Sequence, residues 1–185
     1  MKSFTVYLLV LISLTTIACQ SESEDPTTDR RKSPIAIAQV NHEGTYAKIV
    51  YGQPYKRGRV IFGDLVPYGE VWRTGANEAT ELTVTGDIML AGERVEAGTY
   101  ALFSIPNTET WTIILNSQLG QWGAFDYNAD YDVMRVDVSA TKMEDSAEAF
   151  TIQFEEVEND STNIVMRWDQ TEVRIPVEFI GDGGA

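Results

Sequence analysis

The chain has 185 residues, of which 43% are hydrophobic and 10% aromatic, and it carries a formal net charge of −14. This length suits one domain, and the apolar content is sufficient for a hydrophobic core, which excludes a disordered chain. No basic stripe occurs along the sequence, so we expect no nucleic-acid partner. His42 is the single histidine. That inventory excludes a catalytic triad and a multi-histidine metal site, and we expect no metal and no cofactor.

The first eighteen residues have the form of a secretory signal peptide. Lys2 precedes an almost wholly apolar stretch, Phe4 to Leu14, which is followed by small and polar residues and then by Cys19. The stretch is well short of the roughly 20 residues that span a bilayer. The residues before Cys19 resemble a lipoprotein signal-peptidase site, although Thr16 stands where the usual pattern has leucine. We therefore expect Cys19 to carry a lipid; the alternative is a soluble periplasmic protein with a free thiol.

Residues 19–34 are predicted to be the lipidated cysteine and a flexible acidic tether, because no large apolar side chain follows Cys19 there. An acidic run directly behind such a cysteine resembles the surface-export signal of Bacteroidota lipoproteins; the alternative is a plain soluble linker. The expected location is the cell envelope, as an outer-membrane lipoprotein that is either periplasmic or surface-exposed. An acidic surface repels anionic lipids, so we expect membrane contact through the anchor on Cys19 alone.

Residues 35–181 are predicted to form one all-β domain, and residues 182–185 a tail. Side chains alternate with a period of two, and β-branched and aromatic residues are frequent. Many short strands predict a single antiparallel β-sandwich, with an open β-barrel as the alternative. A tight turn is expected at Asp169–Thr171 and a short helical turn between Ala124 and Asp130. The expected strands are Ile35–Val40, Thr45–Tyr51, Glu70–Arg73, Glu81–Val84, Ile88–Leu90, Thr99–Ile105, Thr110–Leu115, Val133–Val138, Phe150–Val157, Asn163–Trp168 and Glu172–Ile180.

The densest group of polar side chains lies between Trp72 and Thr80. Arg73 offers a rigid fork of donors that suits a carboxylate or a sugar diol. Asn77 offers both a donor and an acceptor, and Glu78 and Thr80 complete the candidate site. The alternative is that these side chains satisfy the carbonyl groups of a crossover loop.

Several motifs are similar to those of the domain of unknown function 2911 family. They are Tyr51-Gly52-Gln53-Pro54, Gly58-Arg59, Phe62-Gly63, Val66-Pro67-Tyr68-Gly69, the run from Val71 to Thr80, Ala97-Gly98-Thr99-Tyr100 and Trp122-Gly123. The resemblance covers residues 35–180. It implies an exported compact domain of the kind found in Bacteroidota lipoproteins and secreted proteins, and it implies no activity, because none is established for the family.

A second cluster joins amides, including Asn116, to the aromatic residues Trp122, Phe125 and Tyr127. Rings that stack on sugar faces beside amides form carbohydrate platforms, whereas the alternative is a loop whose aromatic residues cover the core. Carboxylates are frequent in the adjoining Asp126–Asp132 segment. They offer oxygen ligands for Ca²⁺, but the segment lacks the spacing and the glycine of an EF-hand.

The sequence favours a non-catalytic ligand-binding or envelope-associated module, because it offers no nucleophile–base pair. The candidate ligand is a carbohydrate or another small polar molecule, and the candidate residues are Arg73, Asn77, Glu78, Thr80, Asn116 and Trp122. The alternative is a hydrolase of glycosidic or related bonds that uses Glu78 with Asp126, Asp130 or Asp132. In a third interpretation the polar segment is purely architectural and a protein partner carries the function. Arg73 and Asn77 would then be buried with all their hydrogen bonds made inside the protein.

Overall fold

The structure is a computed structural model, and it describes residues 31–180. The predicted signal peptide, Cys19, most of the tether and the predicted tail lie outside the described residues. The strands are β1 (Ile35–His42), β2 (Thr45–Gly52), β3 (Thr80–Val84), β4 (Ile88–Leu90), β5 (Glu93–Val95), β6 (Gly98–Ile105), β7 (Thr110–Asn116), β8 (Asp132–Phe154) and β9 (Ser161–Phe179). A single 3-10 turn, Ala129–Tyr131, precedes β8, close to the predicted helical turn. None of the described residues forms a helix long and apolar enough to cross a membrane.

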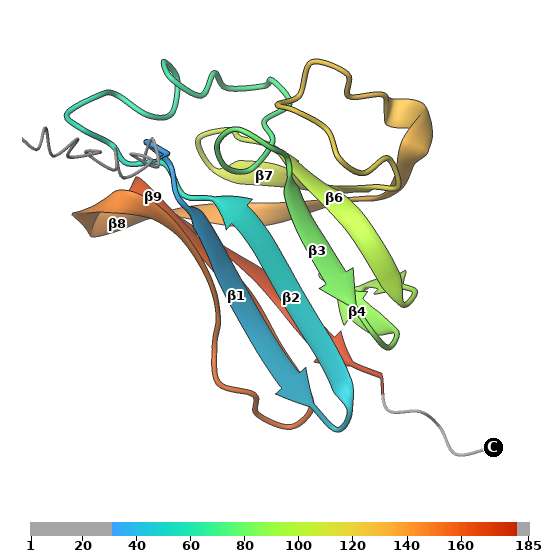
Figure 1. Ribbon diagram of the computed structural model, residues 1–185. Helices are drawn as coiled ribbons and strands as arrows, with labels where there is room; N and C mark the ends of the chain where they lie inside the picture. Colours follow the sequence, from blue (N-terminus) through green and yellow to red (C-terminus); the bar gives the residue numbers. More distant parts are fainter. Residues whose placement is uncertain (1–30, 181–185) are drawn as a thin grey trace, which may run out of the picture. The chain divides into compact units, whose positions relative to one another are not determined.

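The all-β prediction is confirmed by one antiparallel sheet of nine strands in the order β1-β2-β3-β6-β7-β8-β9-β4-β5 (Figure 1). β8 joins the two halves of this sheet, because its first residues pair with β7 and its later residues pair with β9. The sheet is not closed into a barrel. Buried side chains of both halves belong to one core, including Ile49 and Leu102 from one half and Phe150 and Ile175 from the other.

The structure joins two predicted pairs of strands into single strands. The strands predicted at Val133–Val138 and Phe150–Val157 both overlap β8, and those predicted at Asn163–Trp168 and Glu172–Ile180 both overlap β9. Residues 139–149 in the middle of β8 are almost all exposed or half-buried, so they show no alternation that would mark them as a strand. The tight turn predicted at Asp169–Thr171 is wrong, since these residues belong to β9. Asp169 has a φ of 50°, and the pairing with β8 is irregular beside it, so the chain bends there without reversing.

Two short elements also differ from the prediction. The strand predicted at Glu70–Arg73 is wrong; only Trp72 makes a single bridge there, to Ser104 of β6. β5 was not among the expected strands, because its three residues offer too little pattern to be recognised.

Two long connections cover the outer face of β6 and β7 and form a second, smaller core. They are residues 53–79 and 117–131, which lie on the same side of the sheet (Figure 1). Phe103 and Ile114 point outward from the main core and pack with Val71 and Tyr127 of these connections. The middle residues of β6 are therefore buried on both faces. The candidate site lies in this layer of connections.

Candidate functional site

A buried tryptophan anchors the connection 53–79 in the main core. Trp72 is 7% exposed, and its ring lies 5.1–5.9 Å from those of Trp111, Phe150 and Trp168. Its indole Nε1 donates to the carbonyl oxygen of Gly75 at 3.0 Å. Burial of such a ring contributes about 4–6 kcal/mol of hydrophobic free energy as an upper bound. The residues that follow Trp72 are therefore held in a defined position.

Hydrogen bonds to the backbone then shape the segment. The amide of Ala76 donates to the carbonyl of Gly52 in β2 at 3.1 Å. The hydroxyl of Thr80 donates to the carbonyl of Thr74 at 2.8 Å, and the Thr80 side chain has no exposed surface. Of the candidate ligand-binding residues, Thr80 thus lies inside the protein and supports the conformation of the segment.

Arg73 lines a cavity of about 230 Å³, called here the Arg73 cavity. Arg59 and Asn77 line the same cavity, and Trp72 and Trp168 add apolar surface to its wall. Two predicted site residues, Arg73 and Asn77, are therefore brought together. Arg59 is a third polar group here; the sequence selects it only as part of the Gly58-Arg59 motif, and nothing in its local pattern places it beside Arg73.

The guanidinium of Arg73 has no partner within residues 31–180. Its Nε is buried and makes no hydrogen bond, and none of the ion pairs among these residues includes Arg73. Loss of solvation on burial lowers the pKa of Arg73 below its ordinary value. Arg59 donates only to the backbone carbonyls of Tyr55 and Lys56, at 2.5 and 3.0 Å. The cavity therefore presents two guanidinium groups that no described carboxylate neutralises.

Positive charge is concentrated in the segments that surround this cavity. Residues 31–34 and 53–79 together carry six basic and three acidic side chains. The other described residues carry six basic and twenty acidic side chains. The Arg73 cavity thus lies in a basic region of an otherwise acidic domain, and this distribution attracts anions to it.

Glu78 and Trp122 lie side by side near a second cavity. They form a single antiparallel bridge between the two connections, supported by backbone bonds from Ala79 to Gln121 and from Gly123 to Asn77, both 2.9 Å. Trp122 is 57% exposed. Glu78 accepts hydrogen bonds from the guanidinium of Arg31, one of them at 3.1 Å.

The Arg31 pair lowers the pKa of Glu78 below its ordinary value. Glu78 also lines a cavity of about 220 Å³, called here the Glu78 cavity. Glu81 and Gln121 line the same cavity.

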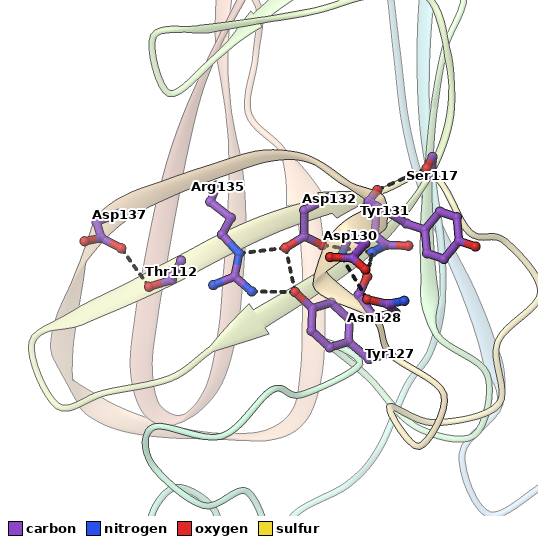
Figure 2. A network of polar contacts seen from close by, with 10 residues as sticks. Thr112, Ser117, Tyr127, Asn128, Asp130, Tyr131, Asp132, Arg135 and Asp137 are labelled. Atoms are coloured by element: carbon purple, nitrogen blue, oxygen red, sulfur yellow. Dashed lines mark hydrogen bonds and ion pairs between the residues drawn. The ribbon is translucent and has the colours of Figure 1, made fainter.

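A polar network that includes Tyr127, Asp132 and Arg135 fixes the connection 117–131 to β8 (Figure 2), and Asn116 is bonded to it. The Asn116 amide donates to the carbonyl of Asn128 at 3.0 Å and to the carboxylate of Asp132 at 2.8 Å. The Tyr127 hydroxyl donates to Asp132 at 2.6 Å, and Arg135 donates to the same carboxylate at 2.6 Å. Burial raises the pKa of Tyr127, and the bond to Asp132 adds to that shift. Asn116, a candidate ligand-binding residue, is fully buried in this network, where it supports the fold.

His42 lies outside both cavities, between two turns at the far end of the sheet. Its Nε2 lies 2.8 Å from a carboxylate oxygen of Asp160, and the carboxylate of Glu43 lies within 4.8 Å of both groups. This hydrogen bond links the β1–β2 turn to the β8–β9 turn, and nothing beside it in the described residues indicates a ligand.

A further hollow of about 690 Å³ is an open groove across β9 and β4. Four glutamates line it, and Glu155 among them is paired with Arg174. Like-charged carboxylates on an exposed strand face are solvated by water, so this groove offers less specific chemistry than the Arg73 cavity.

Comparison with known proteins gives a family and no relative of known activity. Residues 33–177 match the profile of the family described as "Protein of unknown function (DUF2911)". No curated protein and no solved structure matched the chain.

Proposed function

The chain belongs to the DUF2911 family of proteins of unknown function, and we propose that it is an envelope-anchored module that binds a small organic carboxylate in the Arg73 cavity. The observation that supports this proposal is the guanidinium of Arg73, whose buried Nε has no partner within residues 31–180 and which lines this cavity. A buried donor without an acceptor costs about 1–3 kcal/mol. A carboxylate that accepts from this fork would remove that cost and would gain a charge-assisted bond.

The size and the walls of the cavity restrict the ligand. Its volume of about 230 Å³ lies below the 300–1,000 Å³ typical of larger ligands. Indole surface from Trp72 and Trp168 suits a short hydrocarbon part, which free phosphate lacks. A small carboxylic acid satisfies both the guanidinium groups and the apolar wall.

The envelope location is part of the proposal and follows from the sequence. A signal-like segment ends at Cys19, the one cysteine of the chain, and an acidic tether follows. Lipidation would explain the presence of a single cysteine, and the tether would hold the domain near the membrane.

A hydrolase fits the structure less well than a binding module. A general acid for glycoside hydrolysis needs a raised pKa, whereas Arg31 lowers the pKa of Glu78. Asp132 accepts bonds from Asn116, Tyr127 and Arg135, so its oxygens are engaged inside the protein. Neither carboxylate is set up as a catalytic acid, and hydrolysis stays the second candidate.

The experiment is a titration of the chain from residue 19 onward, with Cys19→Ser, against acetate, propionate, succinate and phosphate. We expect one of the carboxylates to raise the midpoint of thermal unfolding. At one hundred times its dissociation constant a ligand stabilises by about 2.7 kcal/mol, which is roughly 5–10 °C for a domain of this size. Arg73→Met should abolish the shift, whereas Arg135→Met should retain it. No shift with any anion, or a shift that persists in Arg73→Met, would refute the proposal.

A further inference from the structure

The bridge between Glu78 and Trp122 places their side chains on one face. The two flanking backbone bonds, from Ala79 to Gln121 and from Gly123 to Asn77, make this a non-hydrogen-bonded pair. Side chains of such a pair lie closest together and point the same way. Glu78 lines the Glu78 cavity, and the exposed side chain of Trp122 projects from the same face as that of Glu78.

A buried acceptor without a partner lines the same cavity. Gln121 is 6% exposed, and its side-chain Nε2 donates to the carbonyl of Gln118 at 2.8 Å. Its Oε1 is buried and accepts no hydrogen bond from any described residue. Buried acceptors are nearly always satisfied, so an orphan at a cavity wall indicates that a donor from outside belongs there.

Two carboxylates also line this cavity. Glu78 and Glu81 contribute carboxylates, and Arg31 already neutralises the first of them. Ile35 and Val50 supply an apolar part of the wall. The cavity therefore suits a ligand that donates several hydrogen bonds and has an apolar face.

We propose that the Glu78 cavity and Trp122 form a carbohydrate-binding site, in which one face of a sugar ring stacks on Trp122 and sugar hydroxyls donate to Gln121 Oε1 and Glu81. A sugar ring combines C–H faces, which pack on an aromatic ring, with hydroxyl groups that donate to carboxylates and amides. A carboxylate ligand would meet Glu81, so this site and the Arg73 cavity select different ligands. The site is separate from the one on which the proposed function rests.

Trp122 provides its own reporter for the test. The other three tryptophans are buried, with Trp72 7% exposed and Trp111 and Trp168 each 2% exposed. A ligand that contacts an exposed indole will therefore change the emission of Trp122. We would follow the tryptophan emission of the chain from residue 19 onward, with Cys19→Ser, during titration with maltotriose, cellotriose and chitotriose. Calorimetry would give the affinity.

At least one trisaccharide should shift the emission to shorter wavelength. Trp122→Ala should remove the shift and weaken binding at least about tenfold, which corresponds to about 1.4 kcal/mol. Gln121→Met should weaken binding to a similar degree, with folding checked by circular dichroism. Tyr68→Ala, a change at an aromatic residue that is 43% exposed outside this cavity, should leave binding unchanged.

Three outcomes would refute the proposed carbohydrate-binding site. They are no emission change with any trisaccharide, a shift that appears only with anionic phospholipid vesicles or with a primary amine, and an affinity that Trp122→Ala leaves intact. Arg73→Met separates the two proposals, because it should abolish carboxylate binding and leave trisaccharide binding unchanged.

Discussion

Replacing Arg73 by methionine should stabilise the protein while it abolishes anion binding. Methionine keeps the unbranched hydrocarbon part of the side chain and removes the buried Nε that has no acceptor. An unsatisfied buried donor costs about 1–3 kcal/mol, and Arg73 is only half-buried, so we expect the free energy of unfolding to rise by about 1–2 kcal/mol. For a domain of this size that is roughly 2–8 °C in the unfolding midpoint. Urea unfolding and calorimetry of the ligand-free protein measure both quantities.

Arg135→Met is the matched control, because the same substitution should have the opposite sign there. Arg135 donates to Asp132, whose side chain is 9% exposed, and also to Tyr127. Its loss leaves a mostly buried carboxylate with fewer partners and should lower the free energy of unfolding by about 1–3 kcal/mol. An ordinary internal hydrogen bond contributes about 1 kcal/mol to stability. If Arg73→Met lowered the free energy of unfolding by about that much or more, Arg73 would be an architectural residue and the prediction would be wrong.

Three further predictions concern packing, acid stability and location. Gly52→Ala should lower the free energy of unfolding by about 3 kcal/mol or more, because its Cβ would lie 2.0 Å from the carbonyl oxygen of Ala76. A decrease below about 1 kcal/mol in denaturant unfolding would mean that the connection 53–79 shifts to make room for the methyl group. Burial alone would raise the pKa of Glu172, but hydrogen bonds from two arginines outweigh it, and the pKa lies below the ordinary 4.5. Its contribution is therefore complete above pH 4.5 and is lost as the pH falls through the lower folded value, so Glu172→Gln should flatten the fall of the unfolding midpoint below that pH; an unchanged profile would contradict the assignment. Cys19→Ser should move the protein from the membrane fraction to the soluble fraction of the cells that produce it, and retention in the membrane would contradict lipidation.

The strands with local patterns could be predicted from the sequence. β1 and β2 alternate, and Pro106 and its neighbours separate β6 from β7, so these strands were placed within a few residues of their ends. The long strands could not be predicted, because the outer part of β8 lies beyond the core and has no buried face to record. Alternation of apolar and polar residues arises when one face of a strand is buried, so a strand with no buried face shows no such alternation.

The candidate sites could be predicted only in part for a related reason. Residue type was sufficient to select Arg73 and Asn77, since both carry forks of donors or acceptors beside a glycine. The sequence also selected Asn116 and Thr80, whose bonds inside the protein depend on partners that are distant in the chain or across a turn. Gln121 was missed because its value lies in an acceptor that is buried without a partner, and that property exists only after folding.

The two cavities adjoin one short segment, residues 76–79, whose backbone turns at Asn77, where φ is 65°. Ala76 and Asn77 line the Arg73 cavity, whereas Glu78 and Ala79 line the Glu78 cavity. One short segment, anchored at its start by Trp72, thereby presents donors on one side and acceptors on the other. The interpretation that this segment is purely architectural requires Arg73 to be satisfied inside the protein, and the lack of a partner for its Nε among residues 31–180 argues against that requirement. The rigidity that makes the segment architectural is also what holds its polar groups in place without the loss of side-chain entropy that a mobile loop would incur on binding.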